Sequence, residues 1–209
     1  MRKPVVIVNF KTYRQGMAAI RLAREVQKFS KDIIIGVQAT DIYETTKATK
    51  LKVYSEHVDY QEPGRNTGYI LPEAVKADKA KGVFLNHSEH RLKLRIIKKT
   101  VKRCNQVGLK TAIFAASLKE AKKIKKLKPD YLIIEPPELV AGKISVSKAK
   151  PGLIANIAKK LKYPFLVGAG IKTAEDVKIA MKLGAKGIAI SSAITKARNP
   201  AKKLRELLK

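Results

Sequence analysis

Short apolar segments and amphipathic segments alternate eight times along this chain, and this alternation restricts the possible folds more than any other feature of the sequence. The apolar segments are rich in Val and Ile, as expected for strands buried on both faces. The segments between them carry apolar residues at helical spacing. In chain order, the eight predicted strands are 5–10, 33–38, 52–58, 82–87, 109–115, 131–134, 165–170 and 187–192.

Strict alternation predicts a parallel sheet, because parallel neighbours need long crossover connections and helices supply them. Eight units in 209 residues favour a closed (β/α)8 TIM barrel over an open, doubly wound sheet. A doubly wound sheet usually carries a GxGxxG fingerprint after its first strand, whereas this chain has the polar residues of VNFKTY there. With 45% hydrophobic residues, we expect residues 1–209 to form a single barrel domain.

The sequence shows no targeting or membrane segment. The first ten residues contain only a brief apolar run without a cleavage pattern, and no stretch of about 18 apolar residues occurs. The single cysteine, Cys104, cannot form an internal disulfide. We therefore expect a cytoplasmic protein that does not enter a membrane.

The chain is strongly basic, with 45 Lys and Arg residues against 17 Asp and Glu residues and a net charge of +28. Such a charge is typical of proteins that meet polyanions, so a basic TIM barrel with a nucleic-acid-binding role is the alternative function. However, the lysines alternate with apolar positions at helical spacing, which indicates solvated helix faces. An aromatic content of 6% without Trp also disfavours base stacking. We expect any polyanion binding to be non-specific.

Polar residues that could carry chemistry follow several of the predicted strands. Glu135 ends a buried strand and precedes Pro136 and Pro137, which force a rigid, extended exit from the sheet. In a barrel, such strand ends converge on one face. A base, a neutral electrophile, a cation and anion-binding loops would meet there: Glu135, His87, Lys11 with Asn9, Gly168, Gly170, Ser191 and Ser192.

Each of these residues also has a purely structural interpretation. Lys11 is one of many lysines, His87 could be a hydrogen-bonded core histidine, and the glycine and serine pairs could be ordinary turn residues. Ser88 and Glu89 are typical of a helix start, and a helix N-terminus would keep His87 neutral.

A barrel glycosidase is a further alternative, since such enzymes use paired carboxylates about 5 to 9 Å apart. Glu62 is the one nearby partner for Glu135 that the sequence suggests, and its EPG context favours a turn.

Several motifs together resemble the triosephosphate isomerase family, in its short, archaeal-type branch. They span the whole chain in order: VNFKTY, EPGRNTGYILPEAV, LNHSEHR, EPPELV followed by VSKAKP, GAGI, and a serine pair after the eighth strand. The resemblance implies a barrel that interconverts dihydroxyacetone phosphate and D-glyceraldehyde 3-phosphate in glycolysis and gluconeogenesis. It implies proton transfer through an enediolate, with neither a metal nor an organic cofactor.

The resemblance also implies roles for individual residues. Glu135 would be the base and His87 the neutral electrophile, the division of roles known for this family. Lys11 and Asn9 would hold the substrate, with Glu89 orienting Lys11. The phosphate would be bound by main-chain groups of a further set: Val140, Gly142, Gly170, Ser191 and Ser192.

Two loops carry further expectations from the resemblance. The sixth loop would close over the site, although Ala141, Gly142 and Lys143 stand where the family usually has a glycine-threonine-glycine hinge. The third loop, around Thr67, would insert into a neighbouring subunit. We therefore expect a homo-oligomer, either a dimer or a tetramer.

Overall fold

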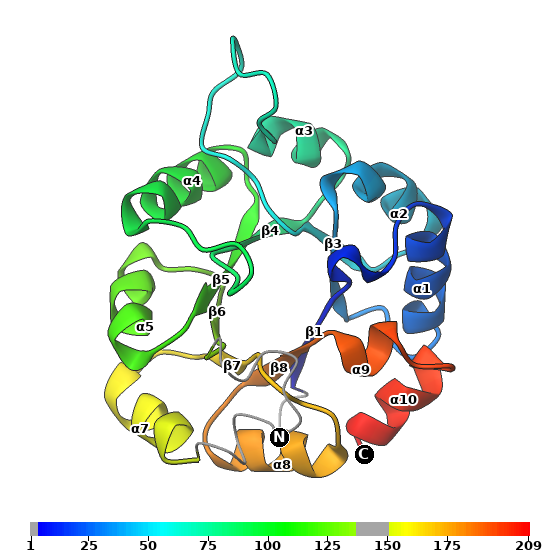
Figure 1. Cartoon of the computed structure of the whole chain (residues 1–209), viewed down its shortest axis with the longest axis vertical. Coiled ribbons are helices and arrows are strands. Elements are labelled where there is room, and N and C mark those ends of the chain that lie inside the picture. Colours follow the sequence, from blue (N-terminus) through cyan, green and yellow to red (C-terminus); the bar gives the residue numbers. More distant parts are fainter. Residues whose placement is uncertain (1–3, 137–150) are drawn as a thin grey trace.

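Eight parallel strands form a closed barrel in the computed structural model, which describes residues 4–136 and 151–209. The helices surround the strands as an outer ring (Figure 1). The strands follow chain order: β1 (Val5–Asn9), β2 (Ile34–Val37), β3 (Lys52–Ser55), β4 (Gly82–Leu85), β5 (Lys110–Ala115), β6 (Tyr131–Ile134), β7 (Leu166–Val167) and β8 (Gly187–Ile190). The predicted TIM barrel is confirmed.

The outer ring contains the following α-helices: α1 (Met17–Gln27), α2 (Ile42–Ala48), α3 (Pro72–Ala77), α4 (Leu94–Gln106), α5 (Leu118–Ile124), α7 (Pro151–Leu161), α8 (Ala174–Lys182), α9 (Ser192–Thr195) and α10 (Pro200–Leu207). Short 3-10 turns occur at Lys11–Tyr13 (η1), Ala39–Asp41 (η2) and Lys125–Leu127 (η3). No helix in the described ranges is both long and apolar enough to cross a bilayer.

Side chains on the two faces of the strands build two separate apolar layers, because successive residues of a strand point to opposite faces. Alternate residues such as Ile7, Tyr54 and Phe84 point inward and fill the barrel. Their neighbours, such as Val8 and Val53, pack outward against the helices. Burial on both faces explains why the strands have continuous apolar sequences.

Pairing between β1 and β8 closes the barrel, with Val5 opposite Gly187 and Val8 opposite Ile190. On its other side, β1 pairs with β2, and Asn9 lies opposite Gly36. The strand β1 therefore sits between the first and last units. This places the residues after β1 beside the loop that follows β8.

Capping side chains hold two helices that follow the last two strands. At α8, Thr173 and Asp176 form a reciprocal capping box. At α10, the Asn199 side chain accepts a hydrogen bond from the Lys202 N–H, and Pro200 occupies the first turn.

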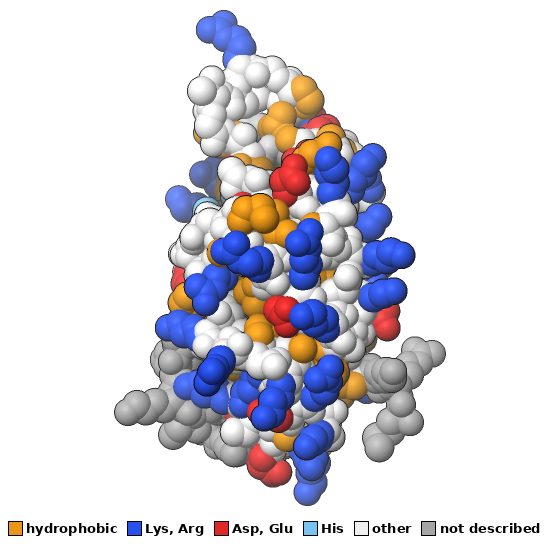
Figure 2. All heavy atoms as spheres, turned by 90° about the vertical axis from the view of Figure 1, so that its right-hand side faces the viewer, with side chains coloured by type: hydrophobic (Ala, Val, Ile, Leu, Met, Phe, Trp, Pro, Cys, Tyr) orange, Lys and Arg blue, Asp and Glu red, His pale blue; other side chains and the backbone are white. Residues whose placement is uncertain are grey.

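Lysine and arginine side chains lie on the outer helices. On the face that carries α1, α2 and α10 they are spread over the whole surface instead of being gathered in one patch (Figure 2). This is the arrangement that the helical spacing of the lysines predicts.

Barrel closure predicts a large stability loss for Gly187→Ala. A Cβ at Gly187 would meet the backbone oxygen of Val5, which cannot move without disturbing the pairing of β1 with β8. We expect the free energy of unfolding to fall by about 3 kcal/mol or more, measured by denaturant titration. Gly152→Ala in α7 is the matched control, since its Cβ would have no neighbour within 4 Å among residues 4–136 and 151–209. Equal stability of the two variants would contradict this account.

Candidate active site

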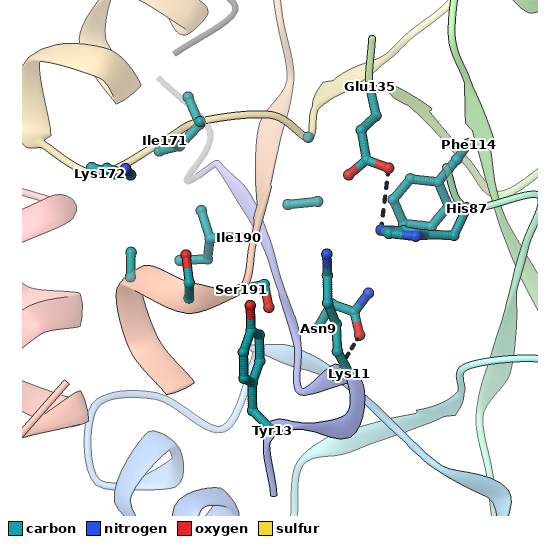
Figure 3. A pocket seen from close by; sticks show the side chains of 15 residues that line it. Asn9, Lys11, Tyr13, His87, Phe114, Glu135, Ile171, Lys172, Ile190 and Ser191 are labelled. Carbon is teal, nitrogen blue, oxygen red and sulfur yellow. Dashed lines mark hydrogen bonds and ion pairs between the residues drawn. The ribbon is translucent and has the colours of Figure 1, made fainter. Parts of the chain in front are cut away.

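A pocket opens at the carboxyl ends of the strands, where the predicted site residues meet (Figure 3). Lys11 and Asn9 occupy the middle of this view, with Glu135 and His87 on one side and the loops after β7 and β8 on the other. Six of the eight strands, β1, β4, β5, β6, β7 and β8, or the residues directly after them, therefore contribute to one site. The polar and glycine lining of the pocket consists of Asn9, Lys11, Tyr13, His87, Glu135, Gly168, Gly170, Lys172, Ser191 and Ser192.

Glu135 is a buried carboxylate with two hydrogen-bonding neighbours. Its N–H donates to the Ala115 carbonyl oxygen at 2.9 Å, which fixes the backbone one residue after β6. Its side chain is only 4% exposed. Oε2 accepts a hydrogen bond from Ser88 Oγ at 3.0 Å and lies 3.2 Å from His87 Nε2. This side chain is placed to accept a proton from a substrate in the pocket.

A hydrogen bond from the backbone selects the tautomer of His87. The Glu89 N–H donates to Nδ1 at 3.1 Å, so a neutral ring carries its proton on Nε2, toward Glu135 and the pocket. The ring packs edge-on against Phe114, with 4.8 Å between ring centroids. The predicted helix start at Ser88 is wrong: these residues form a turn, and α4 begins only at Leu94. The donor to Nδ1 is therefore a turn amide.

Lys11 combines an unusual backbone with a fixed ammonium group. Its φ of 47° lies in the left-handed region, which is costly for a residue with a Cβ. The Lys11 N–H donates to Asn9 Oδ1 at 3.0 Å, and Nζ pairs with Glu89 Oε1 at 2.7 Å. The Lys11 side chain is 13% exposed. These contacts hold a cation beside Glu135 and His87, where an anionic substrate would need it.

The loops after β7 and β8 form the opposite wall of the pocket. Gly170 has a φ of 68°, a conformation that glycine adopts without strain. Ser191 follows β8 directly, and its buried Oγ has no hydrogen-bond partner in residues 4–136 or 151–209. The same ranges contain no cluster of three or more His, Cys, Asp or Glu side chains that could hold a metal ion.

Comparison with known proteins gives a clear relationship. Residues 4–207 match the family model described as "Triosephosphate isomerase". The chain belongs to the triosephosphate isomerase family. It is 40% identical to a protein named triosephosphate isomerase from Saccharolobus solfataricus over 100% of this chain and 96% of the relative. It is 37% identical to one of the same name from Methanocaldococcus jannaschii, over 98% and 99% of the two chains.

The structure brings together most of the residues that the family resemblance indicates. Asn9, Lys11, His87 and Glu135 line the pocket with Gly170, Ser191 and Ser192, and Glu89 contacts Lys11 from one side. Val140 and Gly142, together with the expected hinge at Ala141, lie outside the described residues.

One carboxylate of this site is absent from the sequence-based set. Glu56 lines a second cavity, which shares Asn9, Lys11 and His87 with the pocket and also contains Glu89. The strand predicted over 52–58 includes Glu56, whereas β3 ends at Ser55. Conversely, Glu62, suggested as a partner for Glu135, is exposed on the third loop and lines neither cavity. That suggestion is wrong.

The unfavourable backbone conformation at Lys11 predicts that two variants, both without the ammonium group, differ in stability. Lys11→Gly removes the Cβ that makes a φ of 47° unfavourable, whereas Lys11→Ala retains it. We expect Lys11→Gly to be more stable than Lys11→Ala by about 1 kcal/mol, measured by chemical denaturation. If the alanine variant is as stable as the glycine variant, Lys11 is not strained.

Proposed function

We propose that this protein is a triosephosphate isomerase, which interconverts dihydroxyacetone phosphate and D-glyceraldehyde 3-phosphate in glycolysis and gluconeogenesis. The observation that carries the proposal is the buried Glu135 carboxylate, whose Oε2 lies 3.2 Å from His87 Nε2 in a pocket that also holds Lys11. A base, a neutral donor and a cation are the groups that proton transfer next to a carbonyl requires. A glycolytic role implies a cytoplasmic location.

In the proposed mechanism, Glu135 removes a proton from C1 of dihydroxyacetone phosphate, and the C–H electron pair forms the enediolate double bond. His87 donates a hydrogen bond from Nε2 to the carbonyl oxygen as negative charge develops there. His87 then gives its Nε2 proton to O2 and takes the hydroxyl proton from O1, so that O1 becomes the carbonyl oxygen. Glu135 returns its proton to C2, which gives the aldehyde. This division of roles is the established one for the family.

The neighbouring groups support charge development. Lys11 stabilises the negative enediolate and phosphate, while Asn9 holds the Lys11 backbone through the 3.0 Å hydrogen bond to its N–H. The 4% exposure of Glu135 removes most water from the base, which protects the enediolate from side reactions. We assign phosphate binding to main-chain groups near Gly170, Ser191 and Ser192, with Val140 and Gly142 as further expected donors.

We propose further that the protein is a dimer or tetramer joined through the loop around Thr67. This loop, between β3 and α3, extends beyond the ring of helices (Figure 1), and Thr67 is exposed on it. A neighbouring subunit would cover the loop around Thr67. The equivalent loop of that neighbour would in turn complete the cavity beside Lys11. Light scattering measures the molecular mass in solution, and a monomer at high concentration would contradict the proposal.

The positive charge supports a weak, non-specific attraction for polyanions. Because the charges are spread over the outer helices, binding of RNA or DNA should not depend on sequence and should fall steeply as salt increases. A titration of a labelled oligonucleotide across a salt series measures this. Tight or base-selective binding at high salt would instead favour a dedicated nucleic-acid function.

Glu135→Gln tests the proposed catalytic base. The amide keeps the size of the side chain and loses the proton acceptor, so kcat should fall by roughly 100- to 10,000-fold while the fold is retained. A coupled assay of glyceraldehyde 3-phosphate formation measures kcat, and thermal unfolding checks the fold. The exposed Glu206→Gln on α10 should be fully active. Near wild-type turnover of Glu135→Gln would remove this residue from the base role.

A further inference from the structure

A second carboxyl group, Glu56, lines a cavity that it shares with Lys11 but not with Glu135. Tyr54 points into the barrel, and Glu56 follows it two residues later on the same face. The Glu56 N–H donates to the Val37 carbonyl oxygen at 3.0 Å, so the strand direction is kept past the end of β3. The Glu56 side chain thus lines the cavity that contains Lys11, His87 and Glu89.

Several charged groups act on Glu56 from different elements. Burial, the largest effect, raises the pKa of its carboxyl group from 4.5 to about 7. The Lys11 N–H lowers this pKa, as a positive charge on His87 would, whereas Asp41 and Glu89 raise it. His57 and His90 also line the cavity, with their rings stacked 4.4 Å apart.

The hydrogen bonds of the Glu56 carboxyl group are incomplete. Its Oε1 is buried and has no hydrogen-bond partner in the described part of the chain. The carboxyl group also lines the same cavity as Lys11, a residue whose φ is 47° and whose N–H donates to Asn9 Oδ1. Glu56 therefore lies near the strained segment that carries the ammonium group, with one carboxyl oxygen that lacks a partner among the described residues.

We propose that Glu56 is a positioning residue of the isomerase, which acts through Lys11 and whose uncharged form favours binding of the dianionic substrate. The inference rests on the proposed function. Lys11 Nζ already pairs with one carboxylate, Glu89, at 2.7 Å. An ionised Glu56 would add a second negative charge beside Lys11 and compete with the substrate phosphate and enediolate for it.

Binding and protonation are then linked. If the uncharged form binds substrate better, substrate must in turn favour proton uptake by Glu56. As the pH rises through about 7, Glu56 ionises and KM should increase. The value of kcat should change less, because Glu135 and His87 keep their contacts. We expect the KM of the wild type, divided by that of Glu56→Gln, to rise about fivefold or more between pH 6 and pH 8.5.

Three proteins are compared in this experiment: the wild type, Glu56→Gln and Glu44→Gln. The glutamine at position 56 imitates the uncharged carboxyl group and cannot titrate. Glu44 is exposed on α2, so its substitution makes the same change in net charge away from the site. The titration of the substrate phosphate affects all three proteins equally and cancels in the ratios of KM.

The outcomes separate the inference from the proposed function. An inactive wild type contradicts the proposed function itself. An active wild type whose KM follows the same pH profile as that of Glu56→Gln overturns the role of Glu56. A KM ratio that rises through pH 7 for Glu56→Gln, and stays flat for Glu44→Gln, supports it.

Stability gives a readout that does not depend on turnover. The folded protein holds the Glu56 proton more tightly than the unfolded chain between pH 4.5 and about 7, because its folded-state pKa is raised. The wild type should therefore lose stability relative to Glu56→Gln as the pH rises across this window. A constant difference would contradict a titrating Glu56.

If Glu56→Gln does not fold, the number of protons that the wild type takes up on binding an anion provides the test. Sulfate, a dianion that does not titrate near pH 7, is the probe, and calorimetry in buffers of different ionisation enthalpy counts the protons. We expect a fraction of one proton to be taken up per bound sulfate at pH 7. Sulfate binding without proton uptake would overturn the inference.

Discussion

Pairing of the first strand with the last is the constraint on which the rest of the molecule depends. Val5 and Gly187 face each other so closely that no side chain fits at position 187. This contact fixes the register of β1 against β8, and a slip by one residue would turn every side chain of β1 to the opposite face. With the register fixed, the residues after β1 lie beside Ser191 and across the pocket from Glu135.

Within the pocket, Lys11 connects the groups that handle charge. Its backbone is held in an unfavourable conformation by Asn9, its ammonium is held by Glu89, and Glu56 lies beside its N–H. A network of this kind keeps a cation in place before the substrate arrives, which is the condition for electrostatic stabilisation of an enediolate. The surrounding hydrogen bonds offset the free-energy cost of the strained backbone.

The sequence predicted the barrel because continuous apolar strands and amphipathic helices alternate without exception. The sequence indicated Glu135 as a site residue because the apolar run that precedes this glutamate ends sharply. It missed Glu56 because YSEHV continues the strand pattern, and the end of sheet pairing at Ser55 depends on a neighbouring strand. The predicted helix start after His87 failed for a similar reason: the Asn86 side chain accepts from the Leu92 N–H and donates to the Phe114 carbonyl oxygen, which closes a loop instead. Such tertiary hydrogen bonds leave no local signature.

In the proposed mechanism, one carboxylate, Glu135, carries a proton between two adjacent carbons of the substrate through an enediolate. Isomerisation of dihydroxyacetone phosphate in D2O, with the product trapped and analysed by NMR, tests this claim most directly. In that mechanism, the proton resides on Glu135 between the two transfers and can exchange with solvent, so deuterium is expected at C2 of the glyceraldehyde 3-phosphate formed. Product that carries no solvent deuterium at C2, as a direct hydride shift would give, would contradict the account.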